Sequence, residues 1–113
     1  MFIIFSNNVK GKVIQLTGLD RAKISKVVKG KYKGEIETSF LIEEINLIDK
    51  KFDIVRLLIA YRQESILLVD DDLNAELHYS SGKIESIGKW TEVESIEGLE
   101  NYSEIDGRFY TVI

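Results

Sequence analysis

Apolar and β-branched residues near the start of the chain occur in two short runs with turn-forming residues between them. The runs are residues 2–5 and 12–17, and Asn7, Asn8 and Gly11 separate them. Asparagine and glycine accept the backbone conformations of tight turns, whereas β-branched residues favour strands. The pattern therefore predicts an N-terminal hairpin.

Short apolar or alternating segments fill much of the second half of the chain. Residues 65–69, 74–79 and 83–87 are separated by an Asp-rich and a Ser/Gly-rich turn sequence, which predicts a three-stranded meander. Asp106-Gly107 is a further turn signal. Residues 108–113, which follow it, are predicted to form a final strand.

Helical spacing is present between Leu41 and Ile59, where apolar residues recur every three or four positions. Since Thr38 and Ser39 can serve as caps, this spacing predicts one long helix or two consecutive helices. Residues 53–62 also alternate like a buried strand, so both structures are open there. We favour the helix.

Two shorter helices are predicted from capping signals. Asp20 has the place of an N-cap for residues 20–29. Thr91 and Glu94 form a T-x-x-E capping box ahead of residues 92–100. Together the elements predict an α+β fold, namely a mainly antiparallel sheet with a C-terminal meander and two to four helices packed on one face.

Composition narrows the function classes. The 113 residues, 44% hydrophobic and 30% charged, fit a single globular domain over residues 1–113. Because the chain has no cysteine and one histidine, disulfides, thiolate metal sites and cysteine nucleophiles are excluded. The apolar residues 1–5 lack a basic flank, and the run 57–61 is too short to span a membrane. We expect a cytoplasmic protein with no membrane contact, cofactor or bound metal.

The net charge of −4 hides a strong polarity along the chain. Residues 1–34 carry eight basic side chains and one acidic one, while residues 35–113 carry seven basic and eighteen acidic ones. Clustered charge of one sign steers encounters with a partner of the other sign. The alternative, that folding interleaves the two halves and cancels their fields, is equally open.

The basic segment 21–33 has the ingredients of a nucleic-acid contact, since its lysines can reach phosphates and its tyrosine can stack on a base. An ordinary exposed loop has the same composition. No known nucleic-acid-binding motif accompanies it, so nucleic-acid binding is the alternative function. The candidate contacts are Lys23, Lys26, Lys29, Lys31, Tyr32 and Lys33.

Two features could indicate chemistry but have simpler explanations. The triplet Asp70 to Asp72 could bind Mg²⁺ or Ca²⁺, yet it lacks a calcium-loop motif and suits a solvated turn. His78 could activate Ser80 or Ser81, but neither serine lies in a nucleophile-elbow sequence. We therefore predict no metal ligand and no catalytic residue, and the protein is not expected to be an enzyme.

The C-terminal part combines carboxylates with aromatic residues, as protein-binding surfaces do. This combination predicts a small inhibitor that occludes a basic protein partner. The concrete forms considered are an immunity or antitoxin-type protein that neutralises a nuclease toxin, and a phage-type inhibitor. The predicted partner-binding residues are Asp70, Asp71, Asp72, Trp90, Glu92, Glu94, Glu97, Glu100, Tyr102 and Glu104.

Overall fold

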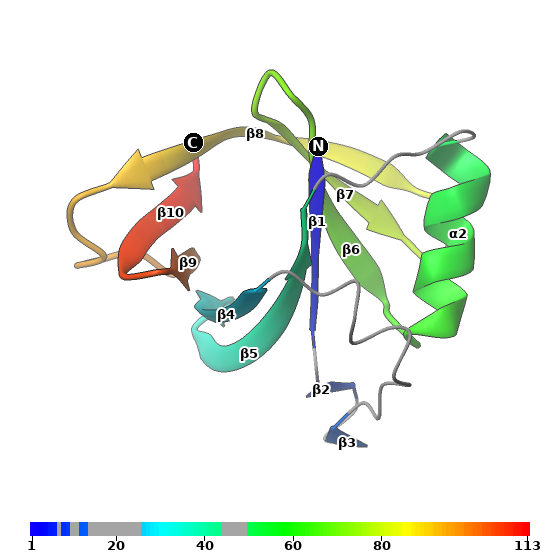
Figure 1. The fold of residues 1–113 in the computed structure, drawn as a ribbon, viewed down its shortest axis with the longest axis horizontal. Helices are drawn as coiled ribbons and strands as arrows, with labels where there is room; N and C mark the ends of the chain where they lie inside the picture. The colour runs from blue at the N-terminus through cyan, green and yellow to red at the C-terminus, as the bar shows by residue number, and fades with distance from the viewer. Residues whose placement is uncertain (7, 10–11, 14–25, 44–49) are drawn as a thin grey trace.

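The computed structural model describes residues 1–6, 8–9, 12–13, 26–43 and 50–113, and in this part of the chain eight strands close into an antiparallel barrel. A two-stranded hairpin, β2 and β3, forms a separate sheet, and the helix α2 lies outside the barrel beside β6 and β7 (Figure 1). The elements are β1 (Phe2–Ser6), β2 (Asn8–Val9), β3 (Lys12–Val13), β4 (Lys26–Tyr32), β5 (Glu35–Ile42), α2 (Lys50–Ala60), β6 (Ser65–Val69), β7 (Asn74–Tyr79), β8 (Ile84–Val93), β9 (Tyr102–Ile105) and β10 (Arg108–Val112).

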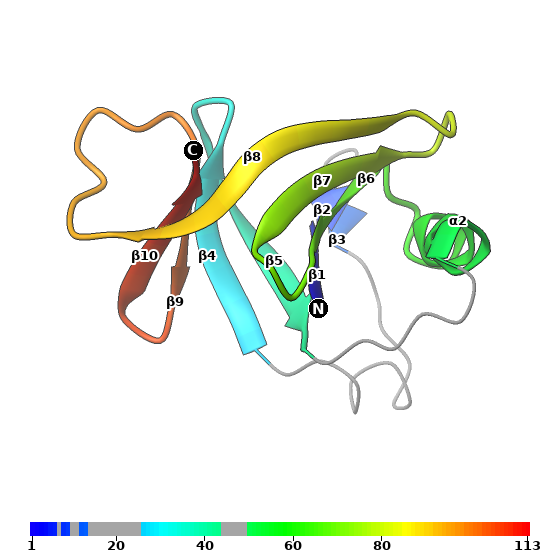
Figure 2. The ribbon, with the colours of Figure 1, turned by 90° about the horizontal axis from the view of Figure 1, so that it is seen from above.

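The barrel order is β1-β5-β4-β9-β10-β8-β7-β6, and β6 returns to pair with β1. Hairpins connect β4 to β5, β6 to β7, β7 to β8 and β9 to β10. The long strand β8 runs from the β7 side of the barrel to the β10 side (Figure 2). Because every barrel strand has two neighbours, no barrel edge is left open for pairing with another chain.

Two apolar clusters lie on opposite sides of the barrel wall. Successive side chains of a strand point to opposite faces, so Ile4 faces the interior while Ile3 and Phe5 face outward. The interior cluster consists of Ile4, Val28, Leu41, Leu67, Val69, Ala75, Trp90 and Ile105. The outer cluster, between the wall and α2, consists of Ile3, Phe5, Ile42, Ile54, Leu58, Tyr61, Ile66 and Leu68. Strands β1 and β6 are therefore apolar on both faces, which explains their uninterrupted apolar sequences.

The predicted α+β fold with two to four helices on one face is wrong, because the sheet closes on itself and α2 is the single helix among the described residues. The helix predicted over 20–29 is contradicted at its C-terminal end, since residues 26–29 begin strand β4, while 20–25 lie outside the described residues. Pairing with β5 on one side and β9 on the other overrides the helical spacing of the lysines.

The helix predicted over 92–100 is also wrong. Strand β8 continues to Val93, where it pairs with Phe109 of β10. The Thr91 hydroxyl donates a hydrogen bond to the carbonyl of Lys89 (3.0 Å), so it does not act as a helix cap. Gly98 has a φ of +79°, which is incompatible with a continuous right-handed helix.

Several other elements agree with the sequence. The three-stranded meander and the final strand are confirmed as β6, β7, β8 and β10. The helical choice over 53–62 is confirmed for residues 53–60, whereas Leu41 and Ile42, predicted as helix, end strand β5. The predicted pairing of 2–5 with 12–17 is wrong where it can be compared, because β1 pairs with β5 and β6. Residues 14–17 lie outside the described residues. In the described part of the chain, no helix is long and apolar enough to cross a membrane.

Candidate functional site

A cavity of about 420 Å³ opens at the end of the barrel where β1, β4 and β7 finish and β5 and β6 begin. We call it the mouth cavity. Ile4, Leu67 and Leu77 form its apolar part, continuous with the barrel interior. The remaining lining is polar or aromatic and includes Ser6, Tyr32, Lys33, Glu37, Ser39, Gln63, Glu64, Ser65, Tyr79 and Asn101.

The change from apolar to polar lining follows from the sequence of β5. Its inward positions are, in order toward the mouth, Leu41, Ser39 and Glu37. Leucine fills the closed part of the barrel, and the two polar residues face the open end, where water or a ligand can reach them. The strand thus places a carboxylate inside the mouth of an otherwise apolar barrel.

Glu37 is the charged group on this inner wall, and it is partly buried. The Ser39 hydroxyl donates a hydrogen bond to its Oε1 (3.3 Å). Burial raises the pKa of Glu37 above its usual value, the hydrogen bond from Ser39 opposes this, and the negative charge of Glu35 raises it further. Among the described residues, no basic side chain forms an ion pair with Glu37.

Tyr32 lies beside Glu37 on the neighbouring strand, and its hydroxyl is 2.5 Å from the Ser103 hydroxyl. Burial raises the pKa of Tyr32, so the phenol stays protonated at neutral pH. Gly30 makes room for the ring, because a Cβ at that position would lie 2.7 Å from Cε2 of Tyr32 and 2.8 Å from the carbonyl oxygen of Tyr102. A larger residue at position 30 would push the ring out of place.

Gln63 fixes one side of the rim, with only 6% of its surface exposed. Its Oε1 accepts a hydrogen bond from the Ser6 amide (3.0 Å), and its Nε2 donates to the carbonyls of Ser6 (3.0 Å) and Tyr61 (2.9 Å). These bonds join the end of β1 to the connection between α2 and β6. Three hydrogen bonds to two residues therefore hold the backbone on this side of the cavity.

On the opposite side, the β4–β5 turn is attached to the loop before β9. The Lys33 amide donates to Oδ1 of Asn101 (2.8 Å), and the Gly34 amide donates to the carbonyl of Glu100 (3.3 Å). Lys33, at a φ of +52°, is exposed at the rim. This places a lysine and a carboxylate, Glu37, on the lining of the same cavity.

The other lysines of the basic segment are not gathered with Lys33. Lys26 lies at the far end of the barrel, where its Nζ is 2.7 Å from Asp106 and 3.4 Å from Glu43, and the hydrogen bond to Asp106 is the main cause that raises its pKa. Lys29 is exposed, Lys31 is half-buried, and Lys23 lies outside the described residues. Tyr32, expected to stack on a base, is instead half-buried in the mouth cavity. Nucleic-acid binding by this segment stays a prediction.

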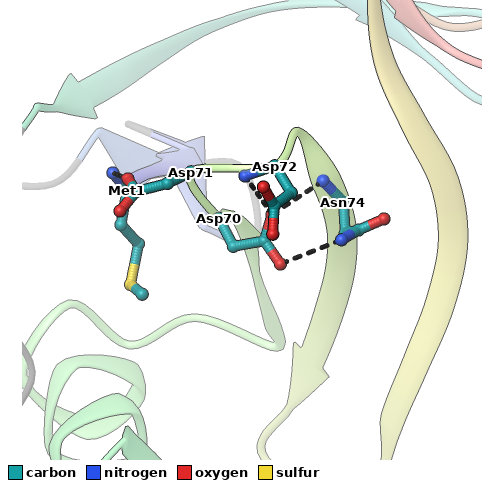
Figure 3. Close-up of polar contacts among 5 residues, drawn as sticks. All are labelled: Met1, Asp70, Asp71, Asp72 and Asn74. Carbon is teal, nitrogen blue, oxygen red and sulfur yellow. Dashed lines mark hydrogen bonds and ion pairs between the residues drawn. The ribbon is translucent and has the colours of Figure 1, made fainter.

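The Asp triplet forms the turn between β6 and β7 (Figure 3). Oδ1 of Asp70 accepts hydrogen bonds from the amides of Asp72 and Asn74, both at 2.9 Å, and the bond from the Asn74 amide is the main cause that lowers the pKa of Asp70. Asp71 forms an ion pair with the terminal amine of Met1. Among the described residues, no group of three or more acidic or histidine side chains is arranged to hold a metal ion.

His78 is buried, with 3% of its surface exposed, and lies away from the mouth cavity. Its Nε2 is 3.3 Å from Oε1 of Glu76, two residues earlier on the same strand. Opposite it in the sheet is Ile66, which packs in the outer cluster. That His78 has no catalytic role stays a prediction.

The predicted acidic surface is only partly assembled. Trp90 is buried in the barrel, 7% exposed, and its ring stacks on Tyr110 at 5.3 Å, so it offers little area to a partner. Tyr102 is half-buried with its ring edge-on to Phe109, and Glu104 faces Lys29 across the sheet. Glu92, Glu94, Glu97 and Glu100 are exposed, and Glu92 is 3.7 Å from Arg108. Binding of a basic protein by these residues stays a prediction.

Sequence reasoning missed the residues that line the mouth cavity, apart from Tyr32 and Lys33. The signal lay in residues 35–42, where Glu37 and Ser39 alternate with outward residues before an apolar end. That alternation would have predicted a strand with a polar inner face. Its meaning depends on closure of the barrel, which turns one face of β5 into the wall of a cavity.

Comparison with protein-family models matches residues 6–113 to the S-adenosylmethionine lyase family. No curated protein matches the sequence. The family is one of enzymes, so the prediction that the protein is not an enzyme is wrong, and the interpretation as an immunity protein, antitoxin or toxin inhibitor is corrected with it. Since the match extends over nearly the whole chain, the protein belongs to the S-adenosylmethionine lyase family.

Proposed function

We propose that the protein cleaves S-adenosylmethionine and binds it in the mouth cavity. The family match over residues 6–113 carries this proposal. The substrate contains a sulfonium, a positively charged sulfur bonded to three carbons. A lyase breaks one of these C–S bonds without adding water. The electron pair of the bond moves to sulfur, which becomes a neutral thioether. Either the carbon then bonds to another atom of the same substrate, or the neighbouring carbon gives a proton to water and its C–H electron pair forms a C=C bond.

This chemistry fits a chain that is poor in reactive side chains. A sulfonium departs readily as a neutral thioether, so the leaving group is already activated in the substrate. The protein then contributes mainly by holding the substrate in a reactive conformation and by excluding water. Neither a cysteine nucleophile nor a pair of histidines is needed for those tasks.

The mouth cavity has the properties that such a ligand requires. Its volume of about 420 Å³ lies within the range of small-molecule sites. The rings of Tyr32 and Tyr79 and the apolar inner part can pack against a purine, and Lys33 and Glu37 offer charges of both signs to an amino acid and a sulfonium. These matches support the placement of the substrate there.

Incubation of the purified protein with S-adenosylmethionine, followed by mass spectrometry, tests the activity. We expect loss of the substrate and two early products whose masses add up to that of the substrate. Products whose masses add up to one water more would indicate hydrolysis. An unchanged substrate with folded protein would refute the proposal.

Filling the cavity tests the location. Ser65 lines the mouth cavity, whereas Ser86 is exposed on β8 and does not. Ser65→Phe should reduce the cleavage rate by at least about tenfold, because the ring takes up the space of the ligand, and Ser86→Phe should leave it unchanged. Equal activity of the two folded variants would place the reaction elsewhere.

A further inference from the structure

We propose that Glu37 makes the mouth cavity selective for a cationic adenosyl ligand over its neutral thioether counterpart. The inference rests on the proposed function for the class of ligand. It assigns to one residue the discrimination between the charged substrate and neutral products or analogues of the same shape.

The surroundings of Glu37 are those of a carboxylate without a cation. It faces the cavity from the inner wall of β5, partly withdrawn from water, and in the described part of the chain its side-chain donor is a neutral hydroxyl, that of Ser39. The lysine of the cavity, Lys33, is exposed at the rim and forms no ion pair with Glu37. A ligand cation entering the cavity would therefore meet a negative charge that the described protein does not neutralise.

The chemistry of a sulfonium makes this charge decisive. A sulfonium has no N–H or O–H group, so it cannot be recognised by hydrogen bonds that it donates. Attraction by a carboxylate and by aromatic ring faces remains, and in a partly dehydrated cavity the attraction by a carboxylate is much stronger than in water. Tyr32 and Tyr79 supply rings on the same lining as Glu37.

Loss of the charge on sulfur removes this attraction. Cleavage converts the sulfonium to a thioether, which leaves the carboxylate of Glu37 partly dehydrated with no cation to offset that cost. Neutral adenosyl thioethers should therefore bind more weakly than the substrate, and products should leave the cavity readily.

Two ligands that cannot be cleaved in this way isolate the effect. S-adenosylhomocysteine is neutral at sulfur, and sinefungin carries an ammonium on the carbon that replaces the sulfur. Their adenosine and amino-acid parts are identical, so the ratio of their Kd values reports the added ammonium, both its charge and its N–H donors, and a Glu37→Gln variant, which keeps an acceptor oxygen, separates the charge from the hydrogen bonds. Isothermal titration of the full chain at neutral pH should show sinefungin binding at least about tenfold more tightly.

Glu37→Gln should reduce this ratio to near one, mainly by weakening the binding of sinefungin. Glu94→Gln is the matched control, since Glu94 is an exposed glutamate that does not line the cavity, and it should keep the ratio. A Glu37→Gln protein that retains the ratio overturns the inference, even if S-adenosylmethionine is cleaved. Absence of both cleavage and binding of either ligand would instead refute the proposed function, and the inference with it.

A pH series on the unmodified protein provides a second test that does not depend on folding of a variant. Protonation of Glu37 removes its charge, so the ratio should fall as the pH is lowered, beginning above the range of an ordinary glutamate. The other ionisable groups that surround the cavity are Tyr32 of β4, Lys33 of the following turn, Glu35 of β5, Glu64 before β6 and Tyr79 of β7. A ratio that is constant from neutral pH down to the acid limit of folding would contradict the inference.

Discussion

Replacement of Gln63 by alanine should destabilise the protein strongly, although the residue is polar and lies between a helix and a strand. The side chain makes three hydrogen bonds, to the amide and carbonyl of Ser6 and to the carbonyl of Tyr61. A typical net contribution is about 0.5–1.5 kcal/mol per bond, and water can replace part of it near the rim. We therefore expect a loss of about 2–4 kcal/mol.

For a chain of this length, a loss of that size corresponds to a fall of roughly 8–17 °C in Tm. Urea titration followed by circular dichroism gives the free energy of unfolding, and a thermal scan gives Tm. Glu64→Ala is the control, because this neighbouring side chain is exposed, and its free energy should stay within about 0.5 kcal/mol of the unmodified protein. A Gln63→Ala loss below about 1 kcal/mol would show that these bonds do not hold the rim together.

Three further predictions concern the barrel wall, the cavity and the β6–β7 turn. Trp90→Ala should lower the free energy of unfolding, measured by urea titration, by about 3–5 kcal/mol, because the ring is buried against Phe2 and Tyr110. A loss of stability under about 1 kcal/mol together with normal ligand binding would contradict this. Gly30→Ala should lower stability by about 1–3 kcal/mol and weaken sinefungin binding in titration, since the added Cβ displaces the Tyr32 ring; unchanged affinity would refute the displacement. Asp70→Asn should destabilise the protein at neutral pH. The difference in stability between the variant and the unmodified protein should shrink as the pH falls through the lowered pKa of Asp70, because protonation removes the same charge. A stability difference that grows on acidification would contradict this.

The elements that the sequence predicted well are those whose partners are close along the chain. The meander of β6, β7 and β8 pairs through short turns, and the helix over 53–60 buries Ile54 and Leu58 at helical spacing. Strand β4 was not predicted, although its partner β5 follows directly along the chain, because Lys26 and Lys29 are spaced as on a helix face; its second partner, β9, is distant in the sequence. Closure of the sheet is likewise invisible in any local window.

Sequence analysis likewise identified some residues of the candidate site and missed others. Tyr32 and Lys33 were noticed for their chemistry but placed in an exposed loop, and Glu37 was overlooked because a glutamate in an unassigned stretch suggests a solvated surface. The enzymatic class was missed for a different reason. An inventory of nucleophiles predicts catalysis only where the protein must supply the reactive group, whereas a sulfonium substrate brings its own leaving group.

The pairing of strands more than half the chain apart makes formation of the barrel a late event in folding. Strand β1 pairs with β6 through Ile3 and Leu68, and β4 pairs with β9 through Lys29 and Glu104. Such distant pairing carries a high entropic cost before contacts form, so folding on the millisecond-to-second scale is expected. The mouth cavity is complete only after these strands have paired, since its lining comes from β1, β4, β5, β6 and β7. A bound adenosyl compound would therefore slow global unfolding of the barrel, and its effect would be seen in the slow amide hydrogen exchange of β1, β4 and β6 together.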